Sequence, residues 1–134
     1  MTALSAPLTV AVVEDDPRIR RLIEDEVVDE GHRVECFNSA EGFLEAITPD
    51  RFDLVLLDLL LPGMTGLDCL LALQALPTAE QPTAPVIVVT ALNDGDMRDQ
   101  VLKAGAQEYI LKPDLFLRLP DLLMQTSKRP TVEP

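Results

Sequence analysis

Five short runs of aliphatic and β-branched residues recur along the chain, at residues 9–13, 34–37, 54–57, 86–89 and 109–111. Most of these runs are continuously apolar, whereas a strand with one solvated face alternates apolar and polar residues. Continuous runs are expected where helices cover both faces of a parallel sheet. The five runs therefore predict an α/β fold, with a parallel sheet between two layers of helices.

Segments with helix signals separate the runs. Asp16 and Pro17 are residue types preferred at the cap and the first position of a helix, and Gly31 is a type that ends one. Asn38 is followed three residues later by Glu41, which resembles a capping box at the start of a second helix. The alternation of strand and helix is therefore expected from the beginning of the chain.

The later helices are predicted from different signals. A leucine-rich segment at residues 67–76 indicates a third helix. Either Asp94 or Asp96 can cap a fourth, which Gly105 would end. Pro120 lies within the apolar segment 115–125, where a helix interior would lose about 3 kcal/mol. We therefore expect the last helix to begin at Pro120.

Length and charge limit the classes of protein. The 134 residues suit one compact domain, expected at residues 8–126, with a disordered tail or the start of a linker at 127–134. The formal net charge of −12 would repel nucleic acid and anionic membranes. The longest apolar stretch, residues 54–61, is interrupted by Asp58 and is much shorter than the ~20 residues of a membrane helix. Direct nucleic-acid binding and membrane insertion are therefore not expected.

The cysteines and the first residues predict a location. Cys36 and Cys69 lie in apolar surroundings and lack the spacing of metal ligands, so we expect reduced, inert thiols. Residues 1–7 lack the basic start and apolar core of a signal peptide. Both features are expected of a cytoplasmic protein.

Polar side chains follow four of the five apolar runs. Glu14 and Asp15 follow the first run, Asp58 follows the third, Thr90 the fourth and Lys112 the fifth. In an open parallel sheet, ligands bind outside the carboxyl ends of the strands. We therefore expect these side chains to line one crevice.

The charges in this crevice favour a metal ion. Two unit charges ~4 Å apart repel by about 4 kcal/mol at an effective dielectric constant of about 20. Lys112 supplies one of the three positive charges that Glu14, Asp15 and Asp58 require, and a divalent cation would supply the other two. The candidate ligands are all oxygens, and the only histidine, His32, lies elsewhere, which favours Mg²⁺. Asp58 is then the best placed nucleophile for phosphoryl transfer, because it ends the central strand.

From residue 8 to about residue 125, the chain resembles the receiver domains of two-component response regulators. The resemblance rests on VVEDD at residues 12–16, LDLLLPGMTG at 57–66, VVTA at 88–91, GA at 105–106 and KP at 112–113. It implies a receiver-type, flavodoxin-like (βα)5 sandwich with strand order 2-1-3-4-5. It also implies a signalling phosphoacceptor, which is no enzyme beyond its own phosphotransfer and dephosphorylation.

The resemblance further implies how the site is used. Asp58 would accept a phosphoryl group from a histidine kinase or a histidine phosphotransfer protein, with Mg²⁺ or Mn²⁺ as the cofactor. Glu14, Asp15, Asp58 and the main-chain carbonyl of Leu60 would be the metal ligands. The downstream partner, the pathway and the oligomeric state are not specified by any motif.

Three more residues carry roles by resemblance. Thr90 and Lys112 would contact the phosphoryl oxygens, and Tyr109 would be an aromatic switch that turns inward as Thr90 moves. The bond between Lys112 and Pro113 would be cis, since a proline lowers the cost of the cis form to ~1 kcal/mol or less.

The sequence also departs from the family pattern. Leu60 and Leu92 are apolar at positions where many relatives carry polar groups that guide a water molecule, which predicts slow self-hydrolysis of the phosphorylated form. Asp114 and Pro120 would alter the face formed by the fourth helix, fifth strand and fifth helix, through which some relatives dimerise.

Other classes of protein are less compatible with the sequence. A phosphohydrolase of the haloacid dehalogenase type would need a second acid at position 60, which is leucine. A flavodoxin-like nucleotide or flavin binder would need a phosphate loop in place of residues 14–17, which are mostly acidic. A receiver-shaped module without phosphorylation would lack Asp58, Thr90 or Lys112. The chain could be a free-standing regulator or a receiver within a longer protein.

Overall fold

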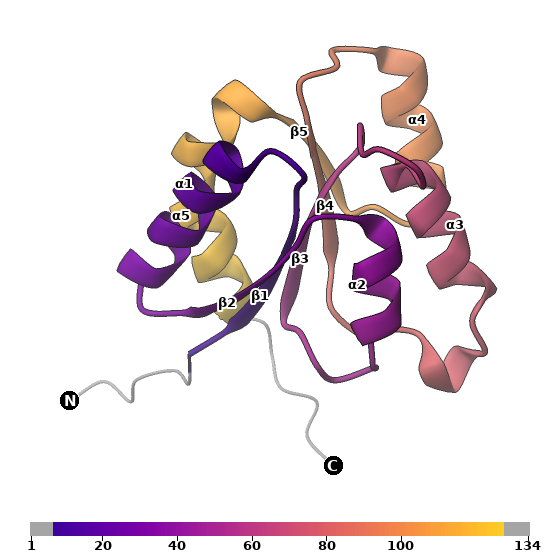
Figure 1. The fold of residues 1–134 in the computed structure, drawn as a ribbon, viewed down its shortest axis with the longest axis horizontal. Helices are drawn as coiled ribbons and strands as arrows, with labels where there is room; N and C mark the ends of the chain where they lie inside the picture. Colours follow the sequence, from indigo (N-terminus) through magenta and orange to yellow (C-terminus); the bar gives the residue numbers. More distant parts are fainter. Residues whose placement is uncertain (1–6, 128–134) are drawn as a thin grey trace.

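The architecture is an alternation of strands and helices, seen in a computed structural model that describes residues 7–127 (Figure 1). The strands are β1 (Thr9–Val13), β2 (Arg33–Phe37), β3 (Leu54–Asp58), β4 (Val86–Thr90) and β5 (Glu108–Leu111). The helices are α1 (Pro17–Asp29), α2 (Ala40–Ala46), α3 (Gly66–Ala75), α4 (Gly95–Lys103) and α5 (Lys112–Ser127), with a 3-10 turn η1 (Thr78–Glu80). The predicted tail lies outside the described residues, except for Ser127, which ends α5.

The five strands form one parallel sheet in the order β2-β1-β3-β4-β5, which confirms the predicted order. Helices α1 and α5 cover one face of the sheet, and α2, α3 and α4 cover the other (Figure 1). In this order β2 lies on one side of β1, and β3, which follows β2 in the chain, lies on the other side. Such a reversal of strand order opens a crevice at the carboxyl ends of β1 and β3.

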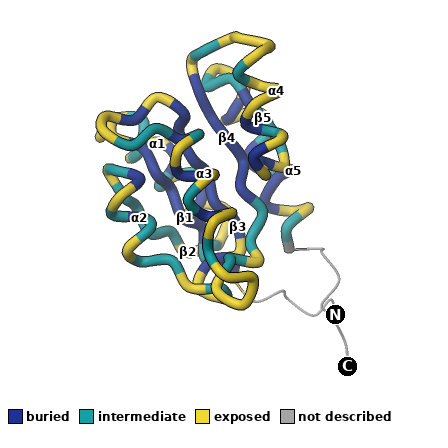
Figure 2. The backbone as a smooth tube through the Cα atoms, turned by 90° about the vertical axis from the view of Figure 1, so that its right-hand side faces the viewer, coloured by how far each residue is buried: buried dark blue, intermediate teal, exposed yellow. Residues whose placement is uncertain are grey.

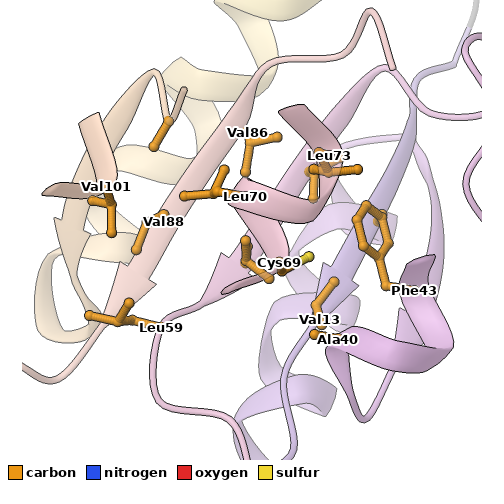
Figure 3. Close-up of a cluster of buried hydrophobic side chains, with 14 of the residues drawn as sticks. Val13, Ala40, Phe43, Leu59, Cys69, Leu70, Leu73, Val86, Val88 and Val101 are labelled. Atoms are coloured by element: carbon orange, nitrogen blue, oxygen red, sulfur yellow. The ribbon is translucent and has the colours of Figure 1, made fainter. Parts of the chain in front are cut away.

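Each face of the sheet has its own core, because successive side chains of a strand point to opposite faces. Val10, Val12, Leu54 and Leu56 pack against α1 and α5. Figure 3 shows the other core, in which Val13, Phe43, Cys69, Val88 and Val101 come together from the sheet and from α2, α3 and α4. All residues of β3 and β4 are buried, as the dark central strands of Figure 2 show. The continuous apolar runs therefore follow from burial on both faces.

The predicted ends of the helices are confirmed at α1 and α4. Asp16 caps α1, and Asp94 rather than Asp96 caps α4 by accepting from two main-chain N–H groups. Gly31 and Gly105 follow these helices with φ of 91° and 112°, a conformation that favours glycine.

The predicted capping box at α2 is wrong. Ser39, not Asn38, is the cap, and its hydroxyl accepts from the N–H of Gly42 at 3.1 Å. Glu41 therefore does not fold back onto the start of α2. Its carboxylate accepts instead from the N–H of Met64 at 3.2 Å and so joins α2 to the loop after β3. Two adjacent residues that are both good caps cannot be separated by sequence spacing alone.

The prediction that the last helix begins at Pro120 is also wrong. Helix α5 runs from Lys112 to Ser127 with Pro120 inside it. Its inner face buries four leucines, each worth ~1.5–3 kcal/mol, at positions 115, 119, 122 and 123. That burial outweighs the cost of about 3 kcal/mol for an internal proline.

The predicted cis bond before Pro113 is not found, since no peptide bond within residues 7–127 is cis. Because α5 already begins at Lys112, Pro113 lies in its first turn. A proline is tolerated there in the ordinary trans form, since its missing N–H would have no partner within the helix.

The two cysteines and the histidine of the described residues lie outside the acidic cluster. Both cysteines are free, and burial raises the pKa of the Cys69 thiol to about 12. The Nδ1 atom of His32 accepts from the N–H of Leu8 at 3.0 Å, so this side chain fastens the start of β1. None of the helices in the described part of the chain has the length and hydropathy of a membrane span.

Candidate functional site

Glu14 follows β1 directly, and its side chain is only 3% exposed. One carboxylate oxygen lies 2.9 Å from the Lys112 ammonium, and the other accepts from the N–H of Asp16 at 3.0 Å. Burial raises the pKa of the Glu14 carboxyl, although the Asp16 and Lys112 contacts oppose this effect. The acid therefore lies inside the crevice and is held by two donors.

Asp58 ends β3 and is also 3% exposed. Its Oδ1 accepts from the N–H of Leu60 at 3.1 Å, and its Oδ2 lies 3.1 Å from the Lys112 ammonium. Gly66 allows this arrangement, because a Cβ atom there would lie 2.5 Å from the main-chain oxygen of Asp58. The first turn of α3 is therefore packed directly on the end of β3.

Lys112 joins the two buried acids. It begins α5 at the end of β5, and its ammonium contacts both Glu14 and Asp58. Burial lowers the pKa of Lys112, but the contacts with the two carboxylates outweigh burial and raise it overall. Lys112 is therefore charged in the crevice.

The acidic cluster has the donors that a metal ion needs. Carboxylate oxygens of Glu14, Asp15 and Asp58 all lie within 4.8 Å of one another. Lys112 neutralises one of these charges, so two negative charges are left for a divalent cation. Three oxygen donors at one accessible edge fit Mg²⁺, which prefers oxygen ligands and keeps several water molecules. Among the described contacts of Leu60, only its N–H takes part in the site, and its carbonyl remains a predicted ligand.

Thr90 and Tyr109 meet at one residue, Leu92. The fully buried Thr90 accepts at Oγ1 from the N–H of Leu92 at 3.1 Å. The Tyr109 hydroxyl donates to the carbonyl of the same residue. Tyr109 also borders a cavity of about 430 Å³ whose lining includes Asp94, Arg98 and Leu117. The two predicted switch residues are thus connected through a single peptide segment.

The strand-end pattern located Glu14, Asp15, Asp58 and Lys112 together, but it missed other contacts. Arg20 donates from its guanidinium to the main-chain carbonyl of Glu14 at 2.9 Å. No motif indicated this contact, because Arg20 is one of three arginines in α1 and nothing in the sequence distinguishes it from the other two. The N–H of Asp16 was also missed, since main-chain donors leave no signal in a sequence.

Comparison with known proteins gives one family. The model of the response regulator receiver domain matches residues 10–123. The probable transcriptional regulatory protein TcrX of Mycobacterium tuberculosis is 34% identical over 124 residues, which cover 90% of this chain and 51% of that protein. The chain therefore spans about half the length of this curated relative.

Solved structures agree with this result. A CheY-like receiver domain protein from Methanospirillum hungatei has a TM-score of 0.78 and 29% identity, with 93% of this chain and all of that chain covered. The receiver domain of the sensor histidine kinase PA1611 from Pseudomonas aeruginosa, which has a magnesium ion in its active site cleft, has a TM-score of 0.78 and 25% identity. The alignment covers 91% of this chain and 98% of that one.

The matched residues extend over nearly the whole sheet and include every polar strand end described above. The strand order and the acidic cluster agree with the family match. The chain belongs to the family of response regulator receiver domains, which act in two-component signal transduction.

Proposed function

We propose that Asp58 accepts a phosphoryl group from a phosphohistidine, in a reaction that requires a divalent cation. The observation that carries this proposal is the position of the Asp58 carboxylate. It is 3% exposed, contacts the Lys112 ammonium at 3.1 Å, and lies within 4.8 Å of oxygens from Glu14 and Asp15. No other described group of acids combines these features.

In the proposed reaction, a bond forms between a carboxylate oxygen of Asp58 and phosphorus, and the bond from phosphorus to the donor's imidazole nitrogen breaks. The imidazole leaves and takes up a proton from solvent. Glu14, Asp15 and Asp58 would hold Mg²⁺ or Mn²⁺, which offsets the charge of the phosphoryl oxygens when bound. Lys112 would donate to a phosphoryl oxygen from its present position beside Asp58.

Thr90 would report the new phosphoryl group. Its hydroxyl oxygen now accepts from the N–H of Leu92, and we infer that the side chain turns away from this N–H when its hydroxyl donates to a phosphoryl oxygen. That change would alter the peptide segment on which the Tyr109 hydroxyl is fixed. Phosphorylation would thereby favour one of two arrangements of the surface around Tyr109, as in other population shifts.

The relatives show that domains of this family occur in more than one kind of signalling protein. TcrX is named as a transcriptional regulator and PA1611 as a sensor histidine kinase, so similar domains occur with different neighbours. We propose that this domain, at residues 8–126, works in the cytoplasm with a histidine kinase or a histidine phosphotransfer protein, as a free-standing regulator or within a longer chain. Its downstream partner would be a protein or an effector domain.

The test is incubation with a small acyl phosphate and Mg²⁺, followed by intact mass measurement. We expect one phosphoryl group on the wild type and none on Asp58→Asn or after chelation of the metal. Asp121→Asn, which removes an exposed acid on α5, is the matched control and should be labelled like the wild type. Equal labelling of the wild type and Asp58→Asn would remove Asp58 from this role.

A further inference from the structure

The main chain of Glu14 is held on both sides by contacts from outside its own loop. The N–H of Glu14 donates to the carbonyl of Phe37 at the end of β2, at 2.9 Å. The carbonyl of Glu14 accepts from Nη1 of Arg20 in α1, also at 2.9 Å. Since the Glu14 side chain is bound by Asp16 and Lys112, every polar group of this buried residue has a partner.

The position of the Asp15 carboxylate depends on the peptide group that joins Glu14 to Asp15. Asp15 is exposed, and within residues 7–127 its carboxylate has no hydrogen-bond or ion-pair partner. The carbonyl of Glu14 and the Cα of Asp15 lie in one planar peptide unit. A donor that fixes the carbonyl therefore fixes the direction from which Asp15 projects toward Glu14 and Asp58.

We propose that Arg20 is a positioning residue for the metal site, which it serves by holding the Glu14 carbonyl. This inference rests on the proposed function, since it assumes that Glu14, Asp15 and Asp58 bind a divalent cation. Arg20 itself would not touch the metal or the phosphoryl group. Without it, the peptide could rotate, and the cluster would lose the arrangement in which three oxygens lie within 4.8 Å.

The surroundings of Arg20 make a clean test possible. Its side chain is half-buried and borders a cavity of about 290 Å³ with Cys36, Phe37 and Asn38, so a replacement of similar length meets no tight packing. Arg21 is the next residue of α1, carries the same charge and is exposed. Arg21→Met therefore removes one positive charge from the same helix but leaves the carbonyl contact intact.

The experiment measures Mn²⁺ affinity by electron paramagnetic resonance, without phosphorylation. We expect Arg20→Met to weaken Mn²⁺ binding about tenfold, which is typical when a residue that orients metal ligands is lost. Arg21→Met should stay within about twofold of the wild type, because a solvated charge at a distance is screened by salt. Arg20→Lys, which retains a charged donor, should recover part of the loss.

A second measurement separates positioning from general loss of structure. With a small acyl phosphate, Arg20→Met should require more Mg²⁺ for half-maximal labelling but should approach the wild-type rate when the metal is saturating. If Arg20→Met does not fold, Arg20→Gln replaces it, because its amide is too short to keep the same contact.

Equal Mn²⁺ affinity of Arg20→Met and Arg21→Met would overturn the inference about Arg20. Failure of the wild type itself to bind Mn²⁺ would contradict the proposed metal site, which is a different outcome. A rate deficit of Arg20→Met that persists at saturating metal, with unchanged Mn²⁺ affinity, would also overturn the positioning role.

Discussion

The loops after β1 and after β4 both lie at the carboxyl edge of the sheet, but they are held very differently. In the loop after β1, Glu14 is buried, and its main-chain and side-chain polar groups all have partners from β2, α1, α5 or the loop itself. In the loop after β4, residues 91–94 are mostly exposed, and two contacts converge on Leu92 from Thr90 and Tyr109.

The helices that follow these loops continue the contrast. Helix α1 buries Ile23 and Val27, whereas Val101 is the only buried residue that α4 contributes. Figure 2 shows α4 and the loop before it as largely exposed. A region with few buried apolar contacts opens at lower free energy than one fixed in the core. The difference indicates a rigid acidic loop that would bind the metal and a more easily rearranged segment that would respond to phosphorylation.

Two glycines test the packing beside the acidic cluster and in the more exposed region: Gly66 packs on the end of β3 at Asp58, and Gly95 begins α4. Gly66→Ala should lower the free energy of unfolding by about 3 kcal/mol, because its Cβ would lie 2.5 Å from the oxygen of Asp58 and 2.8 Å from the Cα of Leu59. Gly95→Ala, at the start of α4, meets nothing within 4 Å and should be neutral or stabilising by up to about 1 kcal/mol. Urea denaturation measures both, and similar effects of the two changes would break the comparison.

Replacing Lys112 tests how strongly the buried acids Glu14 and Asp58 depend on its ammonium for stability. Lys112→Met leaves Glu14 and Asp58 buried without their cation, so we expect a loss of about 2 kcal/mol in unfolding free energy in metal-free buffer. Mg²⁺ should recover part of that loss. Lys103→Met, at an exposed position of α4, is the control, and an equal loss there would contradict the prediction.

Leu60 lies two residues after Asp58, and Leu92 lies two residues after Thr90 in the loop after β4; both side chains are apolar. Because neither can orient a water molecule, we expect the phosphorylated form to persist for minutes rather than seconds after the donor is removed. Leu60→Asn should speed the loss of the phosphoryl group about tenfold, since an amide can hold the attacking water. Intact mass measured over time gives the rate, and a wild-type lifetime of seconds would reject the prediction.

Tyr109→Phe should lower the free energy of unfolding less than Gly66→Ala or Lys112→Met does. It removes one hydrogen bond to the Leu92 carbonyl, which is typically worth ~1 kcal/mol. Because this contact lies in the loop after β4, the Mn²⁺ affinity of the acidic cluster should not change. A weaker metal affinity would show that the two regions are not independent.

The fold was predictable where one signal dominated. The apolar runs located all five strands, and Asp16, Gly31 and Gly105 located the ends of α1 and α4, because caps and left-handed glycines have few substitutes. Two predictions failed where signals competed. Ser39 displaced Asn38 as a cap, and the burial of the α5 leucines outweighed the cost of Pro120.

The candidate site was predictable as a location more than as a set of contacts. The strand-end rule brought Glu14, Asp15, Asp58 and Lys112 to one crevice, because parallel strands end at one edge. The contact of Arg20 with a main-chain carbonyl could not be predicted, since it depends on where α1 sits over the loop. The catalytic, metal-binding and switch roles of these residues, Thr90 and Tyr109 included, remain predictions.

Amide hydrogen exchange, measured by mass spectrometry before and after phosphorylation, tests the central claim most directly. Before phosphorylation, the amides of Glu14 and Asp16 should be protected, and those of residues 91–94 should exchange faster. Phosphorylation should speed exchange at Leu92, whose N–H would lose the Thr90 hydroxyl, and leave Glu14 unchanged. Asp58→Asn should show no change with the same donor. The account would be contradicted if the amide of Glu14 exchanged as fast as those of residues 91–94. It would also be contradicted if the exchange rate of the Leu92 amide did not change on phosphorylation.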